Sequence, residues 1–497
     1  MKAKPTEQKL RGGYYTPPAL AEFLASWAIR TSEDTVFEPS CGDGNMLCAA
    51  AEVLQESGAS PERIAEQVLG IEHAVAEAEK ARQRLRDMGI PVNGKTVATG
   101  DFFGYCATHL KEQLFFGEEL QSAKCFDAVI GNPPFIRYQD FQEAHREVAF
   151  QLIRDMGFSP NRLTNAWLPF LVVSTGLLKP DGRLAMVIPA ELFQVNYAAE
   201  ARKFLSNYFP RLTIATFKTL VFEGIQQEVV LLLGERAAEG ERGIRVVEHA
   251  GAEALGHFDE SIVNDVPVKP MDHSTEKWTQ YFLTKEEIQL LRRLRRRNDL
   301  TWTGDVMNAS VGIVTGNNGY FILGREEARS RGLDEHVEPI VTRSAHLNGG
   351  VFTEADWNEN AAEGRGSLLF MPPKVPHSRL PESVSKYIME GEAAEEHTGY
   401  KCRTRDPWYV VPSVWTPDAF MLRQVHAYPK LILNEAGATC TDTIHRVRFH
   451  PDENSDEVPE ELRRQYVAAF LNSLTFAFAE VTGRSYGGGV LTFEPSE

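Results

Sequence analysis

The chain has 497 residues, of which 43% are hydrophobic and 24% charged, a composition typical of a protein with two or three folded domains. No apolar run approaches the roughly 18 residues that a membrane span requires, and the first residues, MKAKPTEQKLRGG, lack the apolar stretch of a signal peptide. The net charge of −17 gives no general attraction to nucleic acid, so phosphate binding would depend on a local basic groove.

The cysteines form no Cys-x-x-Cys pair, which argues against a zinc site and against a disulfide framework. They are Cys41, Cys48, Cys106, Cys125, Cys402 and Cys440. Thiols that are not paired persist in a reducing compartment. The sequence therefore predicts a cytoplasmic protein with no bound metal and no membrane association.

The first half of the chain alternates between strand-like and helix-like stretches, which is the pattern of a doubly wound α/β sheet. Seven strands are predicted, at 35–40, 67–73, 95–101, 126–132, 182–189, 211–218 and 228–234. Helices are predicted at 45–58, 74–89 and 165–178. We therefore expect a mixed seven-stranded, Rossmann-like sheet.

The chain turns polar around residues 235–275, and the strand–helix rhythm is lost beyond that stretch. The second half is richer in turns that contain Gly, Pro, Trp and Tyr, which predicts an α+β domain with irregular sheets. The predicted organisation is a catalytic domain over 1–245, a linker over 246–275 and a second domain over 276–497.

Glycines or polar residues stand at the carboxyl ends of four of the predicted strands. Gly42 and Gly44 come after the first, in the stretch EPSCGDG, where backbone can approach a ligand closely. Glu72 ends the second strand, where a carboxylate suits the two hydroxyls of a ribose. Asp101 ends the third and is placed to meet an exocyclic amine. Ligands of doubly wound sheets bind at these carboxyl ends, so the sequence predicts a nucleotide pocket there.

The acidic Glu38 beside the glycine turn argues against a phosphate and for a cationic ligand. S-adenosylmethionine carries an ammonium and a sulfonium charge, so it suits this pocket better than NAD or ATP.

The fourth strand ends in Asn132, Pro133, Pro134 and Phe135. An exocyclic amino nitrogen of adenine is a poor nucleophile because its lone pair is delocalised into the ring. Two acceptors aimed at its hydrogens favour a pyramidal, reactive nitrogen, and the Asn132 side-chain oxygen and the Pro133 carbonyl can supply them. The proline rings restrict φ and so preorganise the backbone, while Phe135 can stack on the base. The tetrapeptide therefore predicts methyl transfer to an aromatic amine.

With these motifs the sequence resembles the gamma-class DNA adenine-N6 methyltransferases of restriction–modification systems, the TaqI, PstI and Eco57I types. The resemblance is specific over 12–135 and looser from 270 onward, where VGIVTGNNGYFIL, ILNEAGATCTDTIHRVRF and RSYGGGVLTFEPSE are similar to stretches of the family's specificity domains. It implies an S-adenosylmethionine cofactor, a double-stranded DNA substrate and a C-terminal target-recognition domain. A cognate restriction endonuclease would act as a separate protein, and no nuclease domain is expected in this chain.

The resemblance also implies roles for individual residues. The cofactor-binding set that it implies is Tyr15, Thr16, Pro17, Glu38, Pro39, Cys41, Gly42, Gly44, Glu72, Asp101, Phe102, Asn132 and Pro134. Tyr15, Thr16 and Pro17 would lie near the methionine end of the cofactor, and Phe102 beside its adenine. Phe222, in VFEGIQQEVVLLLG, would face the flipped target base together with Phe135, although a core phenylalanine is the plainer interpretation.

A base inside a duplex cannot enter such a pocket, so the target adenine should be flipped out, while the second domain reads the groove. Candidate DNA contacts there are Arg343, Lys401, Arg403, Arg405, Arg484 and Tyr486.

Two other classes of function stay open at this stage. Asn-Pro-Pro-aromatic motifs also serve methyltransferases that act on RNA or on a protein glutamine, where the nitrogen poses the same problem. A catalytically silent DNA-binding defence module could retain the fold, although the intact Glu38, Glu72, Asp101 and Asn132 argue against it.

Overall fold

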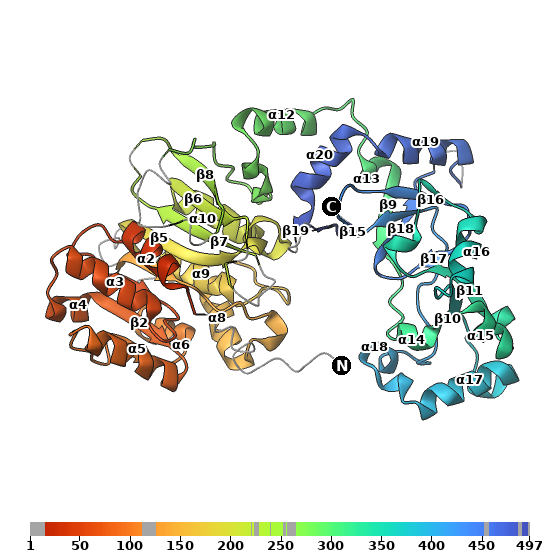
Figure 1. The fold of residues 1–497 in the computed structure, drawn as a ribbon, viewed down its shortest axis with the longest axis horizontal. Helices are drawn as coiled ribbons and strands as arrows, with labels where there is room; N and C mark the ends of the chain where they lie inside the picture. The colour runs from red at the N-terminus through yellow and green to blue at the C-terminus, as the bar shows by residue number, and fades with distance from the viewer. Residues whose placement is uncertain are drawn as a thin grey trace. The chain divides into compact units, whose positions relative to one another are not determined.

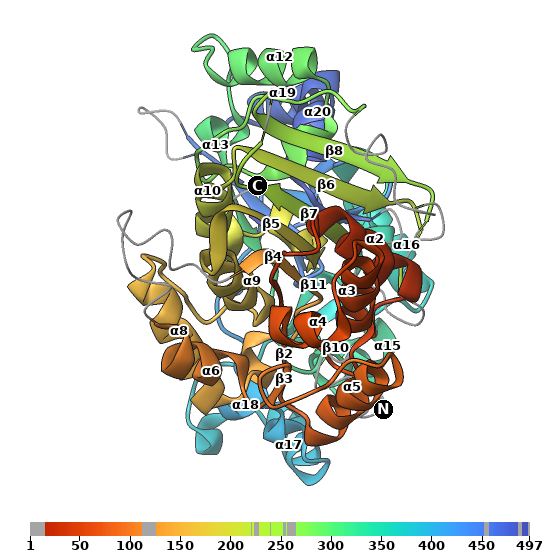
Figure 2. The same ribbon diagram turned by 90° about the vertical axis from the view of Figure 1, so that its left-hand side faces the viewer.

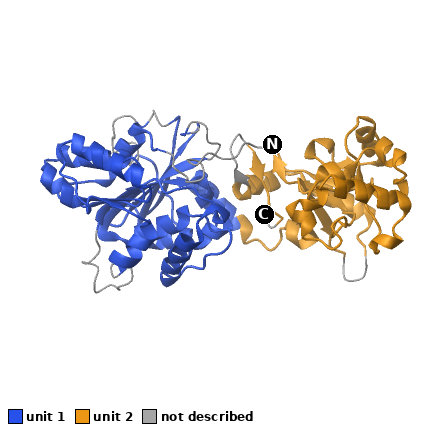
Figure 3. Ribbon diagram, turned by 90° about the horizontal axis from the view of Figure 1, so that it is seen from below, with its two compact units in different colours: residues 1–293 blue, residues 294–497 orange. Residues whose placement is uncertain are grey.

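The computed structural model describes residues 15–111, 126–219, 221–222, 228–238, 240–251, 255, 265–451, 457–485 and 490–495. Contacts divide the chain into two compact units, Met1–Arg293 and Leu294–Glu497 (Figure 3). The first unit runs past the domain end expected at residue 245 and takes in the whole stretch expected to be a linker.

The first unit is built on an eight-stranded sheet with the order β3-β2-β1-β4-β5-β7-β6-β8. Every strand except β7 runs in the same direction, and β7 lies antiparallel between β5 and β6. The strands are β1 (Val36–Glu38), β2 (Val68–Glu72), β3 (Val97–Thr99), β4 (Phe126–Gly131), β5 (Leu178–Pro189), β6 (Arg211–Phe217), β7 (Val229–Glu235) and β8 (Gly243–His249).

The seven predicted strands are all present, so the doubly wound, Rossmann-like fold is confirmed, but the predicted strand number is wrong. The eighth strand, β8, lies in the polar stretch that was expected to be a boundary. It pairs in parallel with β6 along its whole length, from Arg211↔Gly243 to Phe217↔His249. Pairing with β6 at the edge of the sheet sets its conformation, and its apolar residues Ile244 and Val247 are buried.

Helices cover both faces of this sheet (Figures 1 and 2). One face packs against α2 (Pro18–Ala28), α3 (Asn45–Glu56), α4 (Pro61–Gln67) and α5 (Val75–Asp87). The opposite face packs against α6 (Phe102–His109), α8 (Glu143–Asp155), α9 (Trp167–Gly176) and α10 (Ala199–Tyr208). This three-layer arrangement leaves the carboxyl ends of the strands to form the site.

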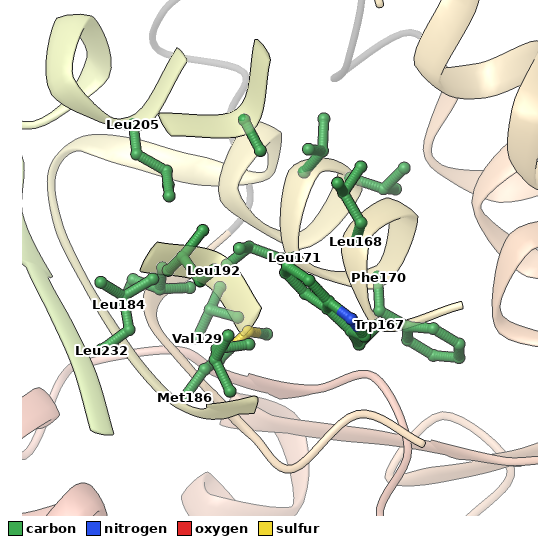
Figure 4. Close-up of a cluster of buried hydrophobic side chains, with 14 of the residues drawn as sticks. Val129, Trp167, Leu168, Phe170, Leu171, Leu184, Met186, Leu192, Leu205 and Leu232 are labelled. Carbon is green, nitrogen blue, oxygen red and sulfur yellow. The ribbon is translucent and has the colours of Figure 1, made fainter. Parts of the chain in front are cut away.

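The core beneath β4 and β5 is centred on α9 (Figure 4). All ten residues of this helix are buried. Trp167 and Leu171 pack with Val129 of β4 and with Leu184 and Met186 of β5 in one cluster. Since burying each such side chain contributes about 1.5–3 kcal/mol, the cluster fixes the ends of β4 and β5 firmly.

The second unit contains three smaller sheets, with the orders β10-β13-β11-β17, β12-β16-β14-β18-β9 and β15-β20-β19. Its strands are β9 (Met307–Val311), β10 (Ile322–Leu323), β11 (Val337–Val341), β12 (Val351–Phe352), β13 (Leu368–Phe370), β14 (Ala419–Leu422), β15 (Gln424–Val425), β16 (Leu431–Asn434), β17 (Thr439–Cys440), β18 (Ile444–Phe449), β19 (Arg484–Ser485) and β20 (Leu491–Thr492). The predicted α+β domain of irregular sheets is confirmed.

The helices of the second unit are mostly short. They are α13 (Thr303–Val306), α14 (Asn318–Phe321), α15 (Arg325–Ser330), α16 (Glu354–Ala362), α17 (Glu382–Ala393), α18 (Tyr400–Arg403), α19 (Glu460–Phe470) and α20 (Ser473–Thr482), with α12 (Lys285–Arg295) at the junction of the two units. Among the helices that the structure describes, none combines the length and the apolar character needed to cross a bilayer.

Candidate cofactor and catalytic site

The sheet order brings the predicted pocket residues to one edge. β1 lies between β2 and β4, and chain progression along the sheet reverses between β1 and β4. Parallel neighbours bring the ends of β2, β1 and β4 level, through the pairs Glu38↔Gly70 and Phe37↔Val129. Ligands of doubly wound sheets bind beside such a reversal, and this is where Glu38, Glu72 and Asn132 lie.

The turn after β1 depends on two glycines with left-handed backbone. Gly42 has φ 52° and Gly44 has φ 90°, and Gly44 is the N-cap residue of α3. A Cβ on Gly44 would lie 2.9 Å from the backbone of Ala81, so this glycine also allows α3 to pack closely on α5. Glu72 holds the turn in place, because its carboxylate accepts the N–H of Gly42 at 3.0 Å and that of Ala74 at 2.6 Å.

Glu38 is the most unusual acid of the site. Its side chain is only 3% exposed, and Oε2 has no hydrogen-bond partner among the residues that the structure describes. Burial raises the pKa of Glu38 well above its ordinary value, and the charges of Glu72 and Asp43 raise it further. A buried carboxylate with an unsatisfied oxygen fits a cation, and the ammonium of S-adenosylmethionine is a suitable one.

The turn after β1 and the end of β4 approach each other closely. A Cβ on Gly131 would lie 3.2 Å from the ring of Pro39, which explains a glycine directly before the tetrapeptide at 132–135. Cys41 is 3% exposed and donates its backbone N–H to Ile71 at 2.9 Å. Burial raises the pKa of the Cys41 thiol well above its ordinary value, so this side chain acts in packing rather than as a nucleophile.

The N-terminal aromatic-Thr-Pro motif contacts Asn132 directly. The Asn132 side chain donates from Nδ2 to the hydroxyl of Thr16 at 3.3 Å, and the Thr16 carbonyl accepts from Asn45 Nδ2 at 3.1 Å. Thr16 is buried. Because the donor end of the Asn132 amide faces Thr16, its acceptor end, Oδ1, points away from that residue. Ser40 donates to the Asn132 carbonyl at 3.3 Å and so ties the same residue to the turn after β1.

Thr16→Val is therefore expected to lower kcat, because the amide of Asn132 loses one of the contacts that orient it. A neutral hydrogen bond contributes about 1 kcal/mol net, which corresponds to roughly fivefold in rate. Steady-state methylation of duplex DNA, the substrate that the resemblance implies, would measure the effect, with Thr16→Ser, which retains the hydroxyl, as the control. An unchanged kcat in Thr16→Val would show that this contact does not orient the amide.

The remaining residues of the tetrapeptide lie at different depths. Pro133 is buried, whereas Pro134 and Phe135 are partly exposed, and Phe135 packs against both hydrophobic clusters of the sheet. Phe222 is 7% exposed and belongs to the cluster on the α2–α5 face. Its burial agrees with the plainer interpretation as a core residue, and a role at the target base stays a prediction.

The other predicted cofactor residues surround the same edge. Tyr15 is exposed, its hydroxyl donates to Glu77 at 2.8 Å, and its ring lies next to Gly42. Partial desolvation and this hydrogen bond to Glu77 raise the pKa of Tyr15. Pro17 is the N-cap residue of α2. Phe102 is 3% exposed and stacks on Phe170, with ring centroids 4.7 Å apart, so its ring belongs to the core in this structure.

A partly buried polar network behind the chain that follows Phe135 was not predicted. Asn165 accepts the N–H of Tyr138 at 3.2 Å, and its own amide donates to Glu191 and to the Tyr197 hydroxyl, at 3.2 and 3.0 Å. That hydroxyl donates to Glu191 at 2.6 Å and accepts from Trp167 at 3.1 Å. Burial and the charge of Glu191 raise the pKa of Tyr197, so the hydroxyl stays neutral. The network anchors the chain that leaves Phe135.

The candidate DNA contacts of the second unit differ in their surroundings. Arg343, Lys401 and Arg403 are exposed, and Lys401 and Arg403 lie over the ring of the exposed Tyr400. Arg405 instead donates to the carbonyls of Thr315 and Val314 at 2.7 and 2.6 Å. Arg484 begins β19, but its side chain lies outside the described residues, as does the whole of Tyr486.

Two family models match this chain. The model described as N-6 DNA Methylase matches residues 2–254, and the model described as the C-terminal domain of the type II methyltransferase M.Eco57I matches residues 275–497.

Individual relatives have low sequence identity to this chain, but the similarity extends over most of its length. M.AccI of Acinetobacter calcoaceticus, a type II methyltransferase, is 22% identical over 75% of this chain and 68% of its own length. M.XamI of Xanthomonas campestris pv. amaranthicola, also a type II methyltransferase, is 22% identical over 98% of this chain and 84% of its own. The solved type IIL restriction-modification enzyme MmeI, in complex with DNA, has a TM-score of 0.54 at 12% identity over 91% of this chain and 64% of that one, which supports the fold alone.

The N-6 DNA Methylase model covers just over half of the chain, including the glycine turn, Glu72 and the Asn132 tetrapeptide. The predicted function, enzyme class and cofactor are confirmed. The chain belongs to the N-6 DNA methylase family and is an S-adenosylmethionine-dependent DNA methyltransferase that acts on N6 of adenine.

Proposed function

We propose that residues 132–135 form the methyl-transfer site for a flipped-out adenine, and that Glu38 and Glu72 hold the cofactor beside it. The observation that most supports this is the shared edge of the sheet, where the unsatisfied Oε2 of the buried Glu38 and the side chain of Asn132 follow adjacent strands. In this proposal Glu38 neutralises the ammonium of the cofactor, Glu72 accepts from the ribose hydroxyls and Asp101 accepts from the adenine amine.

The chemistry then depends on the chain's own acceptors. S-adenosylmethionine, when bound, supplies an electrophilic methyl group. Asn132 Oδ1 and the Pro133 carbonyl accept hydrogen bonds from the target N6, which localises its lone pair toward that methyl group. Phe135 stacks on the target base, and Phe222 bounds the pocket on the opposite side. Holding the target N6 in line with the methyl group lowers the entropic cost of bringing the two reacting atoms together.

We further propose that residues 1–245 bind the cofactor and residues 276–497 read the target sequence, with 246–275 between them. The enzyme would act in the cytoplasm as the modification half of a restriction–modification system, with a separate endonuclease. Sequencing methylated bases in DNA from cells that express the chain tests this directly. We expect N6-methyladenine at every copy of one short motif. Methylation scattered without a motif would contradict the role in modification.

Arg403→Ala is expected to weaken DNA binding at all sequences and to reduce the slope of log K against log salt by about 1, because Arg403 is an exposed cation free to meet a phosphate. Arg405→Ala is the matched variant two residues on. Its guanidinium holds Val314 and Thr315, so we expect lower thermal stability. Titrations at several salt concentrations would measure both, and an unchanged slope in Arg403→Ala would rule out a phosphate contact.

A further inference from the structure

His145, near the start of α8, contacts the acid expected to recognise the cofactor's adenine. Its Nδ1 lies 2.7 Å from Oδ1 of Asp101, and the two side chains are 27% and 21% exposed. The other oxygen of Asp101, Oδ2, accepts the N–H of Gly104 at 2.7 Å, which makes Asp101 the N-cap residue of α6. Both oxygens of this carboxylate are therefore held by donors from the protein.

His145 also reaches the neighbouring strand end. The ring of His73, which directly follows Glu72, lies edge-on to the ring of His145, with centroids 5.1 Å apart and planes at 82°. One side chain from α8 thus touches the residues that follow β2 and β3, the two strand ends where the ribose and adenine of the cofactor are expected.

We propose that His145 is a positioning residue for adenine recognition, acting through Asp101; this rests on the proposed role of Asp101 toward the cofactor's amino group. An ionised carboxylate has about four lone-pair directions, of which Gly104 and His145 use two. Fixing these two leaves the remaining lone pairs in a defined direction, so that Asp101 accepts from the exocyclic amine without first losing rotamer freedom. His145 donates from Nδ1 for this purpose and does not itself touch the cofactor.

The alternative is that the contact between His145 and Asp101 is purely structural. Partly exposed pairs of this kind contribute little to stability, so a stability measurement would not separate the two accounts. The two accounts differ in what they predict for a cofactor analogue that lacks the amine. S-adenosylhomocysteine carries the amino group, whereas S-inosylhomocysteine carries a carbonyl oxygen in its place. Only a residue that acts on the amine changes the preference between these two ligands.

The experiment measures calorimetric Kd values of both ligands for the full-length wild type, His145→Phe and His145→Asn. We expect the wild type to prefer S-adenosylhomocysteine by about tenfold or more, the worth of one or two hydrogen bonds to a charged group. His145→Phe retains the ring contact with His73 but cannot donate, and we expect its preference to shrink about fivefold. His145→Asn can place an amide N–H near the position of Nδ1, and we expect it to recover most of the preference.

Glu147→Ala, an exposed change on the same helix, serves as the control and should leave both Kd values unchanged. If the wild type prefers S-adenosylhomocysteine but His145→Phe loses the same factor in affinity for both ligands, the proposal for His145 is overturned and the role of Asp101 stands. A wild type that binds both ligands equally would overturn the role of Asp101 itself. If His145→Phe does not fold, His145→Ala, which also cannot donate, takes its place: a preference that shrinks about fivefold supports the proposal, and an unchanged preference overturns it.

Discussion

Asn132→Ala is expected to lower kcat by about 10²- to 10³-fold, which is the usual cost of removing one preorganised polar group that acts on the reacting atom. The side chain of Asn132 directly follows β4, next to the strand that ends in the buried Glu38, and its Nδ2 donates to Thr16. In the proposed reaction its Oδ1 accepts from the target amine. The loss should fall on kcat far more than on the Kd for S-adenosylhomocysteine. Single-turnover methylation of duplex DNA, together with calorimetry of the ligand, would separate the two quantities.

A double-mutant cycle with Thr16→Val sharpens this test. If Thr16 acts only by orienting the Asn132 amide, Thr16→Val should reduce kcat in the wild type and have no further effect on kcat in Asn132→Ala. Additive losses would mean that Thr16 contributes independently, for example through the cofactor. A value of kcat in Asn132→Ala within threefold of the wild type would contradict the catalytic role of the amide.

Glu38→Gln is expected to weaken S-adenosylmethionine by roughly 10²- to 10³-fold, because removing one member of a buried charge pair costs about 3–5 kcal/mol. The same change should stabilise the cofactor-free enzyme at neutral pH. Burial holds the folded-state pKa of Glu38 above its unfolded value, so between these two pKa values the native state binds more protons and stability falls as pH rises. Glutamine removes the cost of burying an ionisable carboxyl. The difference in Tm between Glu38→Gln and the wild type should therefore vanish at pH values below the pKa of Glu38 in the unfolded state.

Thermal melts at several pH values and calorimetry of the cofactor would test both parts. Asp43→Asn is the matched control, because Asp43 lies on the same turn but is paired with Arg84 at 2.9 Å, and its removal should leave cofactor affinity within a few-fold. Wild-type binding should also release a proton, seen as a dependence of the calorimetric enthalpy on the buffer's ionisation enthalpy. Unchanged cofactor affinity in Glu38→Gln would contradict the assignment of this acid to the ammonium.

The sequence predicts the strands well because each of the seven is a short apolar run bounded by turn residues. The boundaries are less predictable. The sequence predicts a helix to residue 178 and a strand from residue 182, but β5 begins at Leu178 and includes the stretch between them, with a register shift between Phe126 and Ala128 of β4. β8 was missed because its three apolar residues, Ile244, Val246 and Val247, lie in an otherwise polar stretch and form a strand by pairing with β6. Pairing partners of this kind have no local signature.

The residues of the site likewise include some that could be predicted from the sequence and some that could not. The residues directly after each strand could be predicted, since parallel strands bring their carboxyl ends to one edge. The residues that hold them could not. Thr16 reaches Asn132 across 116 residues of sequence, and Asn165 and His145 lie on segments whose sequences resemble ordinary helix starts. Their contacts arise only from the packing of α8 and α9 against the sheet.

In the proposed mechanism, residues 132–135, beside a pocket built on Glu38 and Glu72, direct methyl transfer to N6 of adenine in DNA. The most direct test is mass spectrometry of nucleosides from duplex DNA incubated with the purified enzyme and S-adenosylmethionine carrying an isotopically labelled methyl group. We predict labelled N6-methyldeoxyadenosine with the wild type and at most a trace with Asn132→Ala. Label on cytosine, no label in DNA, or equal labelling by the two proteins would contradict the account.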